Sequence, residues 1–126
     1  MSKLKVLIIM GFFASIFGVK AQTNSNIKVL DITEFKEQIN DKKVVLVDVR
    51  TPREFKQGNI KNSVNIDFFD PQFITSFDGY NKEEPIYIYC QSGNRSGKAS
   101  KKLAELGFTK IYDLKGGYSG WEATQK

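Results

Sequence analysis

The chain has 126 residues, which is enough for one small domain with a single hydrophobic core. Its formal net charge is +5, and its basic residues are scattered, which argues against a nucleic-acid-binding surface. Cys90 is the only cysteine and histidine is absent, so no internal disulfide can form and the commonest zinc ligand is missing. We therefore expect no metal and no other cofactor.

The N-terminus has the pattern of a secretory signal peptide. Two lysines precede an almost wholly apolar segment from Val6 to Val19, and a suitable cleavage point follows Ala21. We expect residues 1–21 to be removed, which lowers the net charge by three to +2, and the mature protein to reach the periplasm of a Gram-negative cell. Because the apolar segment is short for a membrane span, stable membrane insertion is not expected, although an uncleaved N-terminal anchor is the alternative.

Polar residues 22–26 are predicted to form a linker, and residues 27–124 to form one domain in which strands and helices alternate. Capping patterns mark several helix starts, and Gly107 has the place of a left-handed helix end. The predicted strands are 27–30, 44–47, 63–66, 86–89 and 111–114, and the predicted helices are 32–39, 52–57, 71–77, 96–106 and 118–123. This alternation predicts an α/β fold with a central, mostly parallel sheet of about five strands and helices on both faces.

The loop from Cys90 to Ser96 is the predicted chemical centre. It joins the carboxyl end of a buried strand to the start of a helix, which is where ligands bind in open α/β sheets. Backbone N–H groups of such a loop and the helix N-terminus favour a thiolate, and Arg95 adds a permanent cation. Without histidine, the activation of Cys90 depends on these groups. The alternative is that Cys90 is a small buried apolar residue, but Gly93, Asn94 and Arg95 do not suit core packing.

Four signatures in this order resemble the rhodanese-like domain family. They are Val47-Asp48-Val49-Arg50 with Glu54-Phe55, the segment from Gly58 to Ile66, the loop from Cys90 to Ser96, and Leu114-Lys115-Gly116-Gly117 with Trp121. The resemblance covers residues 27–123. Two positions depart from the family pattern: Asn59 stands where histidine is usual, and Asn62 stands where glycine is common. A histidine proton donor is therefore not available, but the loop keeps what the chemistry needs.

The resemblance implies transfer of sulfane sulfur. Four residues separate Cys90 from Arg95, as in the sulfurtransferases, whereas the related phosphatases and arsenate reductases have one residue more. The Cys90 thiolate would take the outer sulfur of thiosulfate or of a persulfide and pass it to cyanide or to a thiol, including a protein thiol. The alternatives are a persulfide carrier, a redox or partner-binding module and, less favoured, a phosphatase or an arsenate reductase.

The resemblance also implies roles for the residues around Cys90, the expected nucleophile. Arg95 would bind the sulfonate of thiosulfate or turn back to brace the loop, and Ser96 would support the anion or cap the next helix. Asp48 and Arg50 would touch the loop or, as the favoured interpretation, form a structural ion pair with Glu54. Trp121 is expected in the core. The predicted anion cradle consists of Gln91, Ser92, Gly93, Asn94, Arg95 and Ser96.

Overall fold

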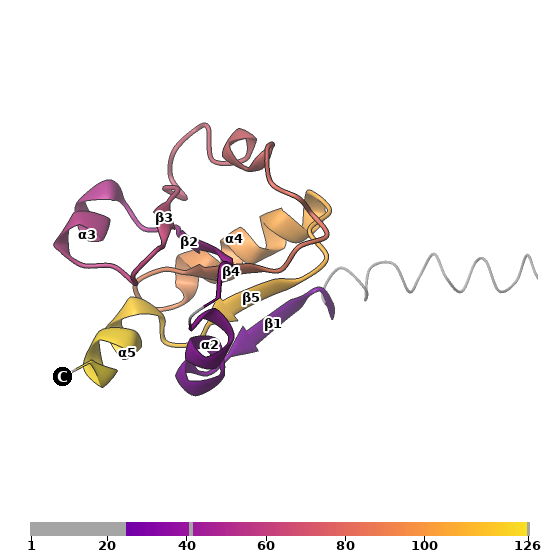
Figure 1. Ribbon diagram of the computed structural model, residues 1–126. Helices are drawn as coiled ribbons and strands as arrows, with labels where there is room; N and C mark the ends of the chain where they lie inside the picture. Colours follow the sequence, from indigo (N-terminus) through magenta and orange to yellow (C-terminus); the bar gives the residue numbers. More distant parts are fainter. Residues whose placement is uncertain (1–24, 41, 126) are drawn as a thin grey trace, which may run out of the picture.

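Five short strands form one sheet, and every pair of neighbouring strands is parallel (Figure 1). The structure is a computed structural model that describes residues 25–40 and 42–125. The predicted α/β fold is confirmed, and the sheet is wholly rather than mostly parallel. The strands are β1 (Ile27–Leu30), β2 (Val45–Asp48), β3 (Val64–Asn65), β4 (Ile86–Tyr89) and β5 (Ile111–Leu114), in the spatial order β1-β5-β4-β2-β3.

The predicted signal peptide, residues 1–21, and the first residues of the linker lie outside the described part of the chain. Within the described ranges, no helix is both long enough and apolar enough to span a membrane.

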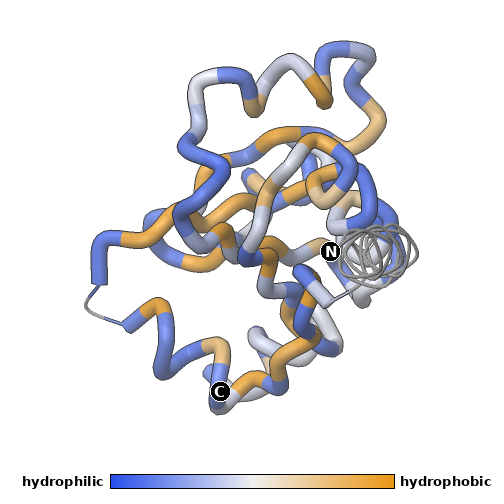
Figure 2. Tube along the Cα trace, turned by 90° about the vertical axis from the view of Figure 1, so that its right-hand side faces the viewer, coloured by the Kyte–Doolittle hydropathy of each residue, from blue (hydrophilic) through white to orange (hydrophobic). Residues whose placement is uncertain are grey.

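Helices cover both faces of the sheet, as predicted. α2 (Ile32–Ile39) and α5 (Gly117–Thr124) pack on one face, α4 (Asn94–Glu105) packs on the other, and α3 (Pro52–Gln57) follows β2 (Figure 1). Alternate residues of β4 therefore enter two separate cores, with the isoleucines on the α4 side and the tyrosines on the α2 and α5 side. Figure 2 shows apolar residues recurring along the central strands, whereas the outer turns are largely hydrophilic.

Local capping interactions set the ends of the helices next to the site. The Thr51 hydroxyl accepts the Glu54 N–H, while the Glu54 carboxylate accepts the Thr51 N–H, so α3 begins with a capping box. At the C-terminal end of α4, Gly107 has a φ of 105° and ends the helix. The Phe108 N–H then donates to the Leu103 carbonyl at 3.1 Å, which completes a Schellman motif. Both boundaries agree with the sequence prediction.

The predicted helix over 71–77 is wrong, because the structure has turns that end in a short 3₁₀ helix, η1 (Thr75–Phe77). Phe73, Phe77 and Asp78 donate their backbone N–H groups to carbonyls three residues earlier, which is the 3₁₀ pattern. The hydroxyls of Thr75 and Ser76 also donate to the Gln72 carbonyl, at 3.1 and 2.8 Å, and such side-chain bonds favour turns over a regular helix. Phe73 and Phe77 still point into the core, with ring centroids 5.1 Å apart. The apolar spacing of this segment therefore indicates burial and not an α-helix.

Candidate active site

The loop after β4 places Cys90 between the end of the central strand and the start of α4. The Cys90 Sγ atom accepts a hydrogen bond from the Gly93 N–H at 3.1 Å and lies 3.4 Å from the Ser96 hydroxyl oxygen. Gly93 has a φ of 115°, in the left-handed region that favours glycine, and is the N-cap of α4. α4 thus begins at Asn94, two residues earlier than predicted. Its N-terminus brings partial positive charge next to the sulfur.

The other predicted cradle residues have different surroundings. Gln91 is half-buried, whereas Ser92 and Asn94 are exposed. Ser96 is fully buried in the first turn of α4, and its hydroxyl donates to the Gly93 carbonyl at 3.2 Å. Because Gly93 is the N-cap, the predicted capping role of Ser96 is wrong, and the contact of its hydroxyl with Cys90 is the relevant one.

The N-terminus of α5 holds the backbone of this loop. The Tyr118 N–H donates to the Cys90 carbonyl at 2.8 Å, and the Ser119 N–H donates to the Gln91 carbonyl at 3.0 Å. N–H groups in the first turn of a helix have no partner within the helix, so the loop satisfies them. A Cβ atom on Gly117 would lie 2.6 Å from both of these carbonyl oxygens. Gly117, which the sequence analysis names only as part of a family signature, thus packs closely against the loop.

Alanine at Gly117 is expected to destabilise the protein by about 3 kcal/mol, because the residue has a φ of 58° and its Cβ would meet loop backbone. Gly116 is a matched control, since its φ is 80° and a Cβ there would meet nothing within 4 Å. Gly116→Ala should cost only about 1 kcal/mol for the backbone conformation. Urea unfolding measures both free energies. Equal losses would show that the contact between Gly117 and the loop is unimportant.

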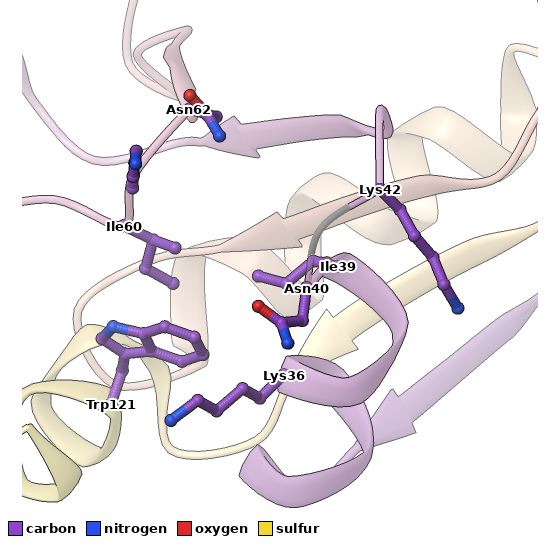
Figure 3. Close-up of a pocket in the computed structure, with 8 residues that line it drawn as sticks. Lys36, Ile39, Asn40, Lys42, Ile60, Asn62 and Trp121 are labelled. Carbon is purple, nitrogen blue, oxygen red and sulfur yellow. The ribbon is translucent and has the colours of Figure 1, made fainter.

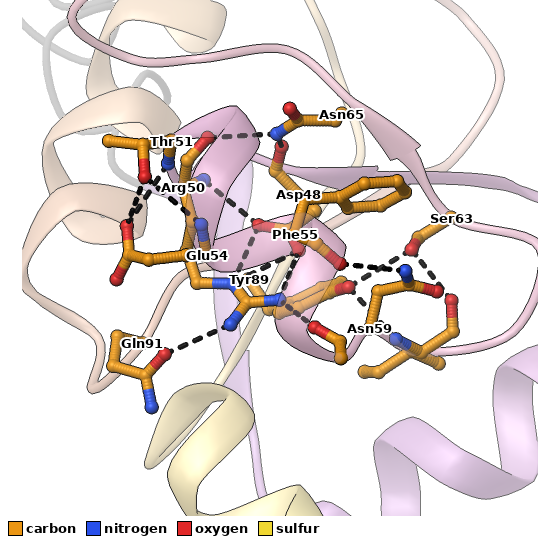
Figure 4. Close-up of polar contacts among 12 residues, drawn as sticks. Asp48, Arg50, Thr51, Glu54, Phe55, Asn59, Ser63, Asn65, Tyr89 and Gln91 are labelled. Atoms are coloured by element: carbon orange, nitrogen blue, oxygen red, sulfur yellow. Dashed lines mark hydrogen bonds and ion pairs between the residues drawn. The ribbon is translucent and has the colours of Figure 1, made fainter.

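A buried ion pair between Asp48 and Arg50 lies beneath the loop (Figure 4). The Arg50 Nη2 atom is 2.6 Å from the Asp48 Oδ2 atom, and the Asp48 and Arg50 side chains are 0% and 2% exposed. Burial by itself lowers the pKa of Arg50, but the hydrogen bonds and charge of Asp48 outweigh it, so the pKa is raised and the guanidinium stays charged. Arg50 also donates to the side chain of Gln91 at 3.0 Å and to the Gly58 carbonyl at 2.6 Å.

The predicted ion pair with Glu54 is therefore wrong for Arg50, which pairs with Asp48 and also touches the loop. Asn65 of β3 completes this arrangement, and the sequence analysis did not assign it a role in the site. Its side-chain amide donates to the carbonyls of Asp48 and Arg50 at 3.0 and 2.8 Å (Figure 4). The sequence signal for Asn65 is its place in the segment from Gly58 to Ile66, which is one of the four family signatures.

Glu54 pairs instead with Arg95. The two guanidinium nitrogens of Arg95 lie 2.7 and 2.9 Å from the two carboxylate oxygens of Glu54, a bidentate geometry that favours a fixed orientation. Of the two roles predicted for Arg95, this structure has the bracing one, because the guanidinium ties the first turn of α4 to α3. The hydrogen bond from Arg95 lowers the pKa of Glu54 from 4.5 to about 2, against the opposing effect of burial.

Low pH should lower the unfolding free energy of the protein partly because Glu54 becomes protonated. Because the folded state holds this pKa below its ordinary value, the stabilisation is present above about pH 4.5 and is lost as the pH falls toward 2. Both side chains are partly exposed, at 20% for Arg95 and 28% for Glu54, so the contribution is about 1 kcal/mol. Glu54→Gln should therefore reduce the acid-induced loss in unfolding free energy. Glu105→Gln, at an exposed position of α4, is the control and should follow the wild type.

The two positions that depart from the family pattern have structural roles. Asn59 is exposed, and its amide donates to the Phe55 carbonyl at 2.9 Å, near the end of α3. Asn62 has a φ of 73°, and asparagine tolerates this left-handed conformation better than most residues other than glycine. This backbone conformation explains why glycine suits the position.

Two of the cavities among the described residues bear on the predicted site residues and on Trp121. The smaller, of about 140 Å³, touches the loop through Gln91 and is also lined by Arg50, Glu54, Gln57, Gly58, Tyr118 and Glu122. The other, of about 280 Å³, lies between α2 and α5 and includes the half-buried Trp121 (Figure 3). None of the predicted site residues lines this second cavity. Trp121 packs against the core on that face, as expected, and is partly open to the cavity.

Comparisons with known proteins agree with this geometry. The Rhodanese-like domain model matches residues 31–124. Uncharacterized protein YqhL of Bacillus subtilis is 35% identical over 121 residues, which cover 96% of this chain and 94% of that protein. Thiosulfate sulfurtransferase GlpE of Ectopseudomonas mendocina is 35% identical over 89 residues, 70% of this chain and 79% of the relative. A crystal structure of a Rhodanese-like domain protein from Staphylococcus aureus has a TM-score of 0.66 and 32% identity, over 75% of this chain and 90% of that one. With its parallel sheet and its cysteine loop at the end of the central strand, this chain belongs to the rhodanese-like domain family.

Proposed function

We propose that the protein is a sulfurtransferase in which Cys90 carries sulfane sulfur as a persulfide. The observation that carries this proposal is the surroundings of the sulfur, with the Gly93 N–H 3.1 Å from Sγ and the N-terminus of α4 beside it. Both stabilise an anion on sulfur without an external base. Relatives named thiosulfate sulfurtransferase, at about 35% identity, support the same class of reaction.

The proposed reaction has two steps. The Cys90 thiolate attacks the outer sulfur of thiosulfate, the sulfur–sulfur bond of the donor breaks, and sulfite leaves with the bonding electron pair. Cyanide or a thiolate then attacks the outer sulfur of the Cys90 persulfide, and the Cys90 thiolate is released. The Gly93 N–H holds the negative charge on sulfur in both states. Arg50 and Asp48 support the loop through Gln91 and do not need to touch the substrate.

The space beside the loop suits small substrates. The cavity of about 140 Å³ next to Gln91 has room for thiosulfate or cyanide. A thiol acceptor, including a protein thiol, would approach from the same side, where Arg50, Glu54 and Glu122 give the wall charges of both signs.

A persulfide carrier is the second candidate function, and the burial of Cys90 favours it. The residue is 1% exposed, and a buried persulfide is protected from thiols in solution. The carrier function predicts stable sulfur on Cys90 together with slow turnover, whereas the enzyme function predicts rapid loss of the sulfur to a small acceptor.

A mass measurement tests the proposal. The purified protein is incubated with thiosulfate, its intact mass is recorded, and cyanide or a thiol is then added. We expect a gain of one sulfur atom per chain, followed by its loss and the formation of thiocyanate when cyanide is the acceptor. A protein that gains no sulfur from thiosulfate or from a persulfide donor would contradict both candidate functions. Hydrolysis of an aryl phosphate that depends on Cys90 would instead favour a phosphatase.

We also propose that the protein is exported to the periplasm. The support is the sequence of residues 1–21, with its lysines and apolar segment. Expression of the full chain in a Gram-negative host, followed by fractionation and intact mass, tests this proposal. The expected product starts at Gln22 and lies in the periplasmic fraction. A full-length product in the membrane fraction would favour the uncleaved anchor, and a product in the medium would favour full secretion.

A further inference from the structure

A groove lined by lysines lies on the side of the sheet that α2 and α5 cover. It consists of the cavity of about 280 Å³ beside Trp121 (Figure 3) and a further cavity of about 460 Å³. Both cavities are lined by Ile39, Lys42, Lys61 and Asn62, so they are continuous. We call this space the basic groove, and its defining residues are Lys36, Ile39, Lys42, Lys43, Lys61 and Trp121.

The charged residues that line the basic groove are all lysines. The four side chains are exposed, and none of them forms an ion pair with a carboxylate of the described residues. Glu37 lines a neighbouring cavity that shares Lys36, and Asp41, next to Lys42 in the sequence, lies outside the described part of the chain. The lysines come from α2, from residues 42–43 and from the turn before β3, so the fold concentrates them. Such a surface suits a negatively charged partner.

The basic groove also has an apolar floor. Leu46 and Ile60 are buried beneath it, and the half-buried Trp121 packs against the same core. The Lys36 Nζ atom lies 6.0 Å from the centre of the Trp121 ring, so one face of the indole is covered by a cation and is not free to stack on a nucleobase. A ligand that combines carboxylates with an apolar side chain therefore fits this surface better than a nucleic acid does.

The type of cation indicates an extended anion and not a single phosphate. Each lysine carries a point charge on a flexible stem, and no arginine lines the groove. Because an isolated exposed ion pair contributes little to binding, several charges along the groove are needed. Residues 1–24 of the chain contain no aspartate or glutamate, so that segment does not supply them. These properties point to an acidic segment of another protein.

Hydrogen bonds connect the wall of the basic groove with the strand that carries Cys90. The Ile60 N–H donates to the Tyr89 hydroxyl at 3.0 Å, and Tyr89 directly precedes Cys90. The Ser63 N–H donates to the Ile60 carbonyl at 3.0 Å and closes the turn that carries Lys61. The position of this turn relative to the reactive strand is therefore fixed.

The helix α5 separates the basic groove from the cavity beside the cysteine loop. Trp121 lines the groove, whereas Tyr118 and Glu122 line that cavity. The segment before β3 also borders both spaces, through Gly58 on one side and residues 60–62 on the other. Since the width of one helix is about 10 Å, a partner seated in the groove lies close to the loop.

We propose that the basic groove docks an acidic segment of the protein whose thiol accepts sulfur from Cys90, with an apolar side chain of that segment against Trp121. The inference rests on the proposed function, because the partner is the protein thiol acceptor. Its thiolate attacks the outer sulfur of the Cys90 persulfide, the sulfur–sulfur bond breaks, and the Cys90 thiolate leaves with the bonding electron pair. The groove makes none of these bonds and acts by raising the local concentration of the acceptor thiol.

The fluorescence of Trp121 tests the docking directly, because this residue is the only tryptophan. The probe is a synthetic peptide rich in aspartate with one central leucine, and the control peptide has asparagine in place of every aspartate. We expect the acidic peptide to change the emission in a saturable way and the asparagine peptide to have little effect at the same concentrations. Added salt should weaken the binding, because the lysines are exposed.

Charge reversal locates the binding site. Lys42→Glu combined with Lys61→Glu should weaken binding of the acidic peptide by about tenfold or more. Lys101→Glu combined with Lys110→Glu is the matched control, since both lysines are exposed and lie outside the groove. This control changes the net charge equally but should alter the affinity by less than about twofold. If the first pair does not fold, Lys42→Gln with Lys61→Gln repeats the test with a smaller loss.

Sulfur transfer tests the connection with Cys90. The sulfur-loaded protein should pass sulfur to the acidic peptide with a terminal cysteine about tenfold faster than to the matching asparagine peptide at low concentration. Lys42→Glu with Lys61→Glu should remove this difference and leave transfer to cyanide unchanged. Equal rates with the two peptides would contradict the role in transfer. A protein that takes up no sulfur contradicts the proposed function, whereas the fluorescence titration still tests the docking.

Other occupants of the basic groove give different results. Equal fluorescence responses to the acidic and asparagine peptides, or equal losses of affinity in the two double variants, would overturn the proposal. Tighter binding of inorganic phosphate, of an oligonucleotide or of vesicles that contain anionic lipid would overturn it as well, because each result assigns the groove to another class of ligand.

Discussion

Cys90→Ser is expected to abolish sulfur transfer. Serine keeps the shape of the side chain, but its hydroxyl is not ionised near neutral pH and cannot hold a persulfide. Loss of a covalent nucleophile lowers turnover by about 10⁴-fold or more, so thiocyanate formation should fall to the background level. The intact mass should also stay unchanged after incubation with thiosulfate.

The fold should survive this change, which separates chemistry from stability. The Gly93 N–H that donates to the Cys90 sulfur can donate to a serine oxygen instead, and the Tyr118 N–H still holds the carbonyl of residue 90. We expect the unfolding free energy of the variant to lie within about 1 kcal/mol of the wild type. Sulfur uptake by a folded Cys90→Ser protein would show that another residue accepts sulfur, and would remove the basis of the proposed function.

Local patterns were sufficient to predict most of the fold. The strands β1, β2, β4 and β5 are short, mainly apolar segments. Residues such as Thr51 and Gly107 mark helix ends through interactions with close sequence neighbours. The failure at 71–77 has the same local origin. Apolar residues at helical spacing predict an α-helix, but hydroxyls at Thr75 and Ser76 bind the Gln72 carbonyl and tighten the turn. A pattern of apolar residues cannot show which acceptor a nearby hydroxyl chooses.

The candidate site could also be predicted only in part. The loop from Cys90 to Ser96 could be predicted because its residues are contiguous, and of these the Gly93 N–H and the Ser96 hydroxyl contact the sulfur. The groups that hold the loop are distant in sequence. The α5 N–H groups come about a quarter of the chain later, and Glu54, which holds Arg95, lies 41 residues before it. Such contacts follow from strand order, which short-range patterns do not specify.

The ion pairs show this limit most clearly. Two arginines and two carboxylates near the site allow more than one pairing, and the sequence favours Arg50 with Glu54 because charge pairs near a helix start are common. The structure pairs Arg50 with Asp48 and Glu54 with Arg95. Burial decides the outcome, since Asp48 is 0% exposed and an isolated carboxylate there would be very costly. The buried carboxylate, rather than the partly exposed one at the start of α3, becomes the partner of Arg50.

Arg50→Met is consequently expected to have the largest effect on stability. Methionine fills much of the same space but leaves Asp48 as a buried charge without its partner, which costs about 3–5 kcal/mol. The same change removes the donors to Gln91 and to the Gly58 carbonyl. Sulfur uptake by the folded fraction should therefore fall as well. Arg53→Met is the matched control on exposed α3 surface, and its unfolding free energy should stay within about 0.5 kcal/mol of the wild type.

A double variant separates the effect of the lost Arg50 contacts from the effect of leaving Asp48 as an unpaired buried charge. Asp48→Asn combined with Arg50→Met removes both buried charges, so the double variant should be more stable than Arg50→Met alone. The Gln91 side chain still lacks its hydrogen bond from Arg50 in this variant. Arg50→Lys should recover little, because an ammonium group cannot make the parallel bonds to Asp48 and reach Gln91 and Gly58 at once. Equal stability of Arg50→Met and Arg53→Met in urea would contradict this account. If instead the double variant recovers stability but not sulfur uptake, the contact from Arg50 to Gln91 is what connects the buried ion pair to the reactive loop.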